Sequence, residues 1–273
     1  MIQSIDRRCF VSALPAALAF AATAGSEASA AIAPAEAVAS LAPSGRLRAG
    51  INLGNIVLAQ KNSQTGEVSG LIVEIARELA WRLGIPLDMV YYDTGGKIAP
   101  AQAVDRWDIA FLGNAQAPEF DFSPPYIYVD ATYLVRQDAP FRGVADLDRK
   151  GVRISTALNS AYDQVLTRTL KNASIVRAPT SAAAIEMFIT ERLDAAGGVR
   201  QALDDAQRSK PGLLVLPDSF TRVDQAVAVP RGREAGLRYL SRYIESIKAG
   251  GLVRDALRNS GQSALISPPQ AVA

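Results

Sequence analysis

The chain has 273 residues, of which 49% are hydrophobic and 21% are charged, and its formal net charge is +2. This balance is typical of a globular protein, and without a dense stretch of lysine and arginine it disfavours nucleic-acid binding. The absence of histidine excludes Ser-His-Asp catalysis and histidine-ligated zinc, so we expect no metal site, no cofactor and no catalytic residue.

Residues 1–30 have the three parts of a secretory signal. A pair of arginines precedes an apolar run at 11–24, and Ala28-Ser29-Ala30 offers small residues to a signal peptidase. The run is shorter than the ~20 residues that a membrane span needs. The order Arg-Arg-x-Phe also resembles a twin-arginine signal, so two export routes stay open. We expect a periplasmic protein that loses its single cysteine, Cys9, with the signal.

The first folded unit alternates strands and helices. Residues 31–43 are rich in alanine and proline and predict a flexible tether. A helix is expected at 71–83, where leucine or isoleucine recurs every four residues, with Gly84 as its cap. Around it we expect strands at 47–52, 87–92 and 109–112 and a short helix at 97–106. This alternation predicts right-handed crossovers and a mostly parallel sheet.

The alternation repeats further along the chain. Strands are expected at 131–136, 152–155, 174–177, 194–197 and 213–216. Helices are expected at 144–147 (short), 160–171, 181–192 and 199–208, with Asn159 as the N-cap of the helix at 160–171. A strand at 225–230 turns back toward the first unit. Closing helices at 231–249 and 251–259 precede a frayed tail at 262–273.

Two such units with a returning segment predict two lobes joined by two strands. Lobe 1 would contain residues 44–135 and 226–262, and lobe 2 would contain residues 136–225. A cleft between lobes is a natural site for a small molecule. We therefore expect hinge closure around a ligand.

The segment 107–126, WDIAFLGNAQAPEFDFSPPY, carries the clearest functional signal. A short apolar strand ends at Gly113-Asn114 and gives way to a polar loop. The loop closes on the motif DFSPPY, in which two prolines forbid both a helix and a central strand. Ligands of open α/β sheets sit at such carboxyl ends of strands.

This motif resembles the D-F-S-x-P-Y signature of the family 3 extracellular solute-binding proteins, the periplasmic receptors of ABC importers. Residues 47–51 resemble the family's opening L-R-V-G strand, 70–83 its G-x-x-V-D-L-A-x-E-L-A helix and 192–196 its G-x-x-D-A segment. The resemblance covers most of residues 46–260. It implies an α/β, two-lobed type II periplasmic-binding-protein fold, with two mostly parallel sheets joined by a two-strand hinge.

The resemblance also implies a function and partners. We expect a monomer without enzymatic activity that delivers a small polar solute, anionic or amino-acid-like, to an ABC permease at the inner membrane. In this family an arginine before the motif grips the ligand carboxylate, an acidic residue after G-x-x-D-A takes the ammonium, and aromatic rings flank the side chain. Here the loop at 113–120 has no arginine, and those other positions hold Val199, Asn55 and Thr94-Gly95.

Only the helix N-terminus at Asn159-Ser160 keeps the family pattern. A buried ammonium without a carboxylate partner is costly, so a ligand that lacks an ammonium or carries negative charge is the simpler interpretation. Glu119 or Asp163 stays open as an ammonium partner. The candidate ligand-binding residues are Asn52, Asn55, Lys97, Gly113, Asn114, Asn159, Ser160 and Arg200.

Two other functions stay open. Exported cyclohexadienyl dehydratases resemble this scaffold, and Lys97 with Glu119 would then be the acid/base pair. A soluble sensor subunit that reports ligand occupancy to a membrane partner is the third alternative.

Overall fold

The computed structural model describes residues 33–100, 105–114 and 120–271, within the unit formed by residues 31–273. The predicted signal at 1–30, part of the predicted helix at 97–106 and most of the loop before DFSPPY lie outside these ranges. Within them, no helix is both long and apolar enough to cross a membrane.

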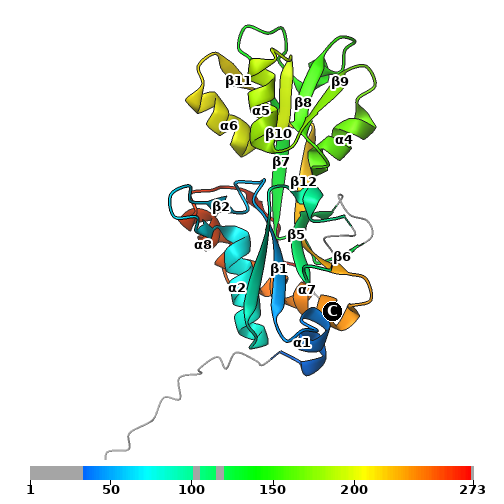
Figure 1. Ribbon diagram of the computed structural model, residues 1–273, viewed down its shortest axis with the longest axis vertical. Coiled ribbons are helices and arrows are strands. Elements are labelled where there is room, and N and C mark those ends of the chain that lie inside the picture. The colour runs from blue at the N-terminus through cyan, green and yellow to red at the C-terminus, as the bar shows by residue number, and fades with distance from the viewer. Residues whose placement is uncertain (1–32, 101–104, 115–119, 272–273) are drawn as a thin grey trace, which may run out of the picture. The chain divides into compact units, whose positions relative to one another are not determined.

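The described strands form one mixed, 11-stranded sheet and a small separate hairpin. The main path runs β4-β1-β5-β12-β7-β10-β8-β9 (Figure 1). The strands are β1 (Leu47–Asn52), β4 (Leu87–Tyr92), β5 (Ile109–Gly113), β6 (Phe120–Phe122), β7 (Ile127–Arg136), β8 (Arg153–Ala157), β9 (Ser174–Ala178), β10 (Ala195–Val199), β11 (Leu213–Val215), β12 (Thr221–Pro230) and β13 (Leu265–Ile266). The hairpin pairs β2 (Gln60–Lys61) with β3 (Val68–Ser69).

The sheet is continuous because two strands of ten residues each, β7 and β12, run through its middle. They pair with each other, β12 also pairs with β5 and β6, and β7 also pairs with β10, β11 and β13. All these pairings are antiparallel, whereas β4-β1-β5 and β10-β8-β9 are parallel. The expectation of two mostly parallel sheets therefore needs correction: parallel groups flank an antiparallel centre in one hydrogen-bonded sheet.

Helices cover the two parallel groups separately (Figure 1). We call β1, β4 and β5 with their helices the first half, and β8, β9 and β10 with theirs the second half. The first half carries α1 (Ala35–Leu41), α2 (Leu71–Leu83), α7 (Glu234–Ala249) and α8 (Leu252–Asn259), and the second carries α4 (Ala161–Thr169), α5 (Ser181–Thr190) and α6 (Arg200–Ser209). Short 3₁₀ turns lie at η1 (Gly95–Lys97) and η3 (Val144–Leu147).

The core follows from the side-chain alternation of the strands. In β7, Tyr133 and Val135 belong to one buried cluster and Leu134 to another, because successive side chains point to opposite faces. In the first half, eight residues of α2 are buried. Its last turn ends at Gly84, whose φ of 67° is the left-handed conformation that glycine adopts without strain.

Two terminal segments that we expected to be loose are packed. Residues 35–41 of the predicted tether form helix α1, where Leu41 is fully buried. Its neighbour Ser40 accepts a hydrogen bond from the backbone N–H of Gly236 in α7 (3.1 Å). In the predicted tail, β13 pairs with β7 and Ser267 is fully buried. Both segments are ordered by distant contacts that composition does not reveal.

Candidate functional site

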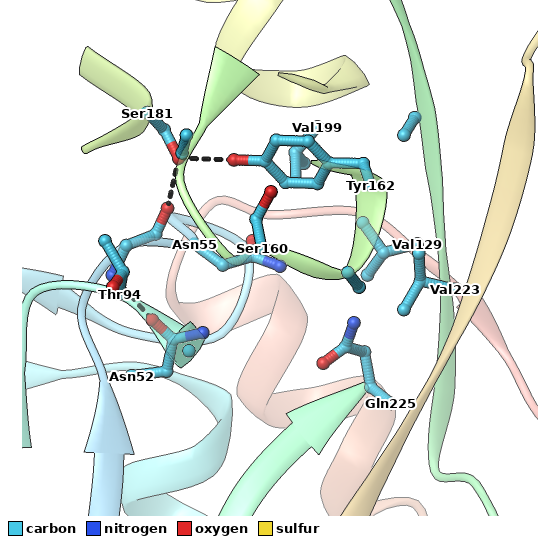
Figure 2. A pocket seen from close by; sticks show the side chains of 15 residues that line it. Asn52, Asn55, Thr94, Val129, Ser160, Tyr162, Ser181, Val199, Val223 and Gln225 are labelled. Carbon is cyan, nitrogen blue, oxygen red and sulfur yellow. Dashed lines mark hydrogen bonds between the residues drawn. The ribbon is translucent and has the colours of Figure 1, made fainter. Parts of the chain in front are cut away.

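A pocket lies where the carboxyl ends of parallel strands meet the first turns of two helices. The loops after β1 and β4 supply one part of it, the starts of α4 and α5 and the end of β10 another, and residues of β7 and β12 complete it (Figure 2). Its empty volume is about 480 Å³, counting the open mouth. It is lined by Asn52, Gly54, Asn55, Thr94, Gly95, Val129, Ala131, Ala157, Ser160, Ala161, Tyr162, Ser181, Val199, Val223 and Gln225.

Two asparagines shape the first loop through their side-chain oxygens, and their amide nitrogens have no described partner. The Asn52 Oδ1 accepts from the backbone N–H of Gly54 (2.9 Å), and the Asn55 Oδ1 accepts from that of Val57 (3.0 Å). These local bonds are the Asx turns that asparagine favours. Since only the oxygen of a carboxamide can accept, both orientations are determined and both Nδ2 groups donate to no described residue.

The N-terminus of α4 brings a second set of donors to the pocket. Ser160 is its N-cap, and its Oγ accepts from the backbone N–H of Asp163 (3.1 Å). The N–H groups of Ala161 and Tyr162 belong to the first turn, which has no intrahelical acceptor for them. Ser160, not Asn159, is therefore the cap. Asn159 adopts φ 57° and donates its own N–H to the Asp163 carboxylate (2.8 Å).

A chain of hydroxyl groups links the second half to the first. The Ser181 Oγ donates to the carbonyl oxygen of Gly54 (3.1 Å) and lies 2.7 Å from the Tyr162 hydroxyl (Figure 2). Because serine has a single hydroxyl proton, Tyr162 donates in the second contact. Burial raises the pKa of Tyr162, which keeps this donor protonated at neutral pH.

Two buried polar side chains in the pocket make no hydrogen bond to the described residues. Gln225 and Thr94 are each only 5% exposed. The carboxamide of Gln225 points toward the centre of the pocket (Figure 2). These two groups are therefore available for hydrogen bonds with a molecule in the pocket.

None of the described residues that line the pocket is charged. Asp163 lies behind the α4 turn, and the Arg177 Nε donates to it (3.0 Å). Lys97 pairs instead with Asp93 (2.7 Å). Arg200 donates to the carbonyl oxygens of Leu216, Pro217 and Asp218, between 2.9 and 3.0 Å.

The pocket thus gathers only part of the predicted site. Asn52, Asn55 and Ser160 line it, whereas Lys97 and Arg200 do not. Gly113 lies in β5 directly opposite Gln225 in the strand register. The Asn114 Nδ2 lies 3.5 Å from an Asp224 carboxylate oxygen. Asn114 lines a neighbouring hollow that shares Ala161 and Val223 with the pocket. Asn159 packs against Gly96 beside the pocket, and Glu119 lies outside the described residues.

Four polar residues of the lining were not among the predicted ligand contacts: Thr94, Tyr162, Ser181 and Gln225. The sequence held one signal for Gln225, a polar side chain at the start of the apolar run QAVAVP. Thr94 stands at a position where the family resemblance implies an aromatic contact, whereas Ser181, the first residue of α5, carries no signal in the sequence. Among the described residues, no cluster of histidine, cysteine or carboxylate side chains could hold a metal ion.

The two halves also touch at Gly96, where a side chain would not fit. A Cβ added there would lie 2.6 Å from the Asn159 Cβ and 2.9 Å from its carbonyl oxygen. Gly96→Ala is expected to push the halves apart and to weaken retention of a bound solute by about tenfold, since overpacking costs roughly 1–3 kcal/mol. Native mass spectrometry of the co-purifying solute, together with the radius of gyration, measures both effects.

Gly143→Ala is the matched control, because a Cβ there meets nothing closer than the Asp218 carboxylate at 3.4 Å. Unchanged solute retention and unchanged size in Gly96→Ala would contradict the steric argument.

Comparison with known proteins gives one family. The chain matches the family described as bacterial extracellular solute-binding proteins, family 3, over residues 48–259. The L-cystine-binding protein TcyJ of Escherichia coli K12 is 23% identical over 194 residues, which span 69% of this chain and 73% of TcyJ.

Solved structures are similar in fold. A putative binding component of an ABC transporter from Wolinella succinogenes, complexed with lysine, has a TM-score of 0.67 at 24% identity. The match covers 79% of this chain and 95% of the Wolinella chain. The ancestral amino-acid-binding protein AncCDT-1, a precursor of cyclohexadienyl dehydratase, has a TM-score of 0.68 at 21% identity. The match covers 81% of this chain and 98% of AncCDT-1. Both show that this is a periplasmic-binding-protein fold.

Proposed function

The chain belongs to the bacterial extracellular solute-binding proteins of family 3, and we propose that it binds a small polar solute in the pocket of Figure 2 and delivers it to the permease of an ABC importer. The relatives named for cystine and lysine make an amino-acid-like solute the first class to test.

One observation carries this proposal: polar groups of nearly buried side chains, without a partner among the described residues, face the pocket. Such groups are free to form hydrogen bonds with a bound solute, and those bonds would stabilise the complex. Gln225 and Thr94 are such groups, and the free amide nitrogens of Asn52 and Asn55 border the same space. The described lining contains no carboxylate, lysine or arginine that could form an acid/base pair with the Tyr162 hydroxyl.

The solute would be held by closure of two lobes. Lobe 1 would contain residues 44–135 and 226–262, and lobe 2 residues 136–225. Their connection would be the long strands β7 and β12, which hinge where they leave one half for the other. The contacts from Ser181 to Gly54 and from Gly96 to Asn159 support a closed arrangement.

Residues 1–30 would direct export to the periplasm, where the monomer meets its permease at the inner membrane. Cell fractionation, with and without replacement of Arg7 and Arg8 by lysine, separates the Sec route from the twin-arginine route.

The dehydratase alternative gains no support from the predicted acid/base pair. Lys97 is paired with Asp93 and does not line the pocket. A direct experiment tests the binding function: the mature chain is purified natively, and small molecules released on denaturation are identified by mass spectrometry. Loss of the same molecule from a Gln225→Ala variant that remains folded would support the pocket. Equal retention by that variant would contradict it.

Ser181→Ala tests the contact between the halves. Removing this hydroxyl deletes the bond to Gly54 and leaves the Tyr162 hydroxyl without its acceptor. Because a net hydrogen bond contributes about 1 kcal/mol, we expect release of the solute to accelerate roughly fivefold. Stopped-flow release experiments measure this rate. Tyr162→Phe, which removes only the donor to Ser181, should give a smaller effect, and the reverse order would contradict the proposed link.

A further inference from the structure

The pocket's free hydrogen-bonding groups are mostly donors. The described lining contributes the Nδ2 groups of Asn52 and Asn55, the Gln225 carboxamide and the Thr94 hydroxyl, none of which donates to a described residue. The first turn of α4 adds two backbone N–H groups. The carbonyl oxygen of Gly54, an acceptor on the same wall, already receives the Ser181 proton.

A ligand that matches these donors would offer hydrogen-bond acceptors. A negative charge on that ligand is favoured at the N-terminus of α4. The N-terminus of a nine-residue helix attracts anions through its free N–H groups and its dipole. Gln225 is an independent pointer, since it is a buried side chain without a partner that faces the same space. Its amide can both donate and accept, which suits a hydroxyl group on the ligand.

An ammonium group, in contrast, has no anionic partner in the described lining. Asp163, the carboxylate in the first turn of α4, is 3% exposed and already accepts from Asn159 and Arg177. By sequence, residues 101–104 and 115–119 hold no lysine or arginine and one carboxylate, Glu119. An uncompensated buried ammonium is strongly disfavoured.

We propose that this pocket takes a short-chain hydroxy carboxylate and discriminates against the α-amino acid of the same shape. The inference rests on the proposed function, because it names the solute class for that binding site. The carboxylate lies at the N-terminus of α4 and the hydroxyl pairs with the Gln225 carboxamide. The space that a small ligand could fill inside the pocket is only about 40 Å³, which limits the ligand to a few heavy atoms.

The test uses matched pairs that differ only in hydroxyl against ammonium. Isothermal titration calorimetry of the mature chain, freed of co-purifying solute by unfolding and refolding, compares glycolate with glycine, L-lactate with L-alanine, and L-2-hydroxybutyrate with L-2-aminobutyrate. We expect at least one hydroxy acid to bind 10-fold or more tightly than its amino acid. L-Lactamide, which keeps the hydroxyl but lacks the charge, should bind more weakly than L-lactate.

Three results would overturn the inference. They are tighter or equal binding of the amino acids, equal binding of lactamide and lactate, and no binding of any acid. An amino-acid preference that disappears in Glu119→Gln would identify Glu119 as the ammonium partner and also overturn it. The proposed function is tested separately. If a different solute co-purifies with the native chain, the proposed binding function is supported and only the hydroxy-carboxylate class is contradicted.

Discussion

Replacing Gln225 with glutamate is expected to weaken binding of the hydroxy acid by about 100-fold at pH 8. The two side chains have nearly the same shape, so the packing of β12 beside Gly113 of β5 is retained. The substitution removes a donor and adds a negative charge that no described cation in the lining can offset. Two like charges about 4 Å apart repel by about 4 kcal/mol at an effective dielectric of 20, which is enough for this loss.

The pH dependence of the affinity loss in Gln225→Glu distinguishes an effect of charge from an effect of packing. A carboxyl buried without a cation is neutral at low pH and ionised at high pH, so the loss should be smaller at pH 5 than at pH 8. Titration calorimetry at both values measures it. Gln64→Glu makes the same charge change on an exposed turn and should leave the affinity unchanged. Wild-type affinity in Gln225→Glu would exclude contact between the ligand and this side chain.

Asp108→Ala is expected to lower the free energy of unfolding by about 3 kcal/mol, because the carboxylate is a fully buried ionic centre. The Arg48 guanidinium donates to both of its oxygens at 2.9 Å, and the backbone N–H of Arg48 adds a third bond at 3.0 Å. Arg233 of the segment before α7 lies 3.4 Å from the same carboxylate. Removing Asp108 leaves two partly buried guanidinium groups without their counter-charge.

Asp88→Ala is the matched control, since it breaks a surface ion pair with Arg46, the residue that precedes β1. Both partners of that pair are more than 40% exposed, and such pairs contribute below about 1 kcal/mol. Urea unfolding of the mature chain gives both values. Equal losses for the two variants would show that burial does not set the strength of the Asp108 interaction.

Local sequence patterns predicted a helix or strand well where the hydrophobic periodicity and the end residues lie within that segment. The strand Leu47–Asn52, the helix Leu71–Leu83 and the strand Leu87–Tyr92 have the predicted bounds. In the helix, apolar residues four apart form one face, and Gly84 supplies the left-handed end. These are properties of residues within one or two turns of each other, so they can be read from sequence.

Predictions failed where distant contacts outweigh local composition. Residues 35–41 resemble a tether in composition, but Leu41 and Ala37 are buried, so they form α1. The single sheet arises because β7 and β12 extend further than their apolar runs suggest, and each pairs with several neighbours. Asn159 is a good N-cap by residue type, yet its φ of 57° places Ser160 in that position.

For the site, the sequence by itself determined the family resemblance and the absence of charged residues at Val199 and of arginine in the loop before DFSPPY, and it predicted three residues that line the pocket, Asn52, Asn55 and Ser160. Only the tertiary structure decided that Lys97 and Arg200 are bound elsewhere and that Thr94, Ser181 and Gln225 line the pocket. The reason is physical: periodicity is set by neighbours along the chain, whereas a side chain's partner is chosen in space, as Ser181 and Gly54 meet across 127 positions.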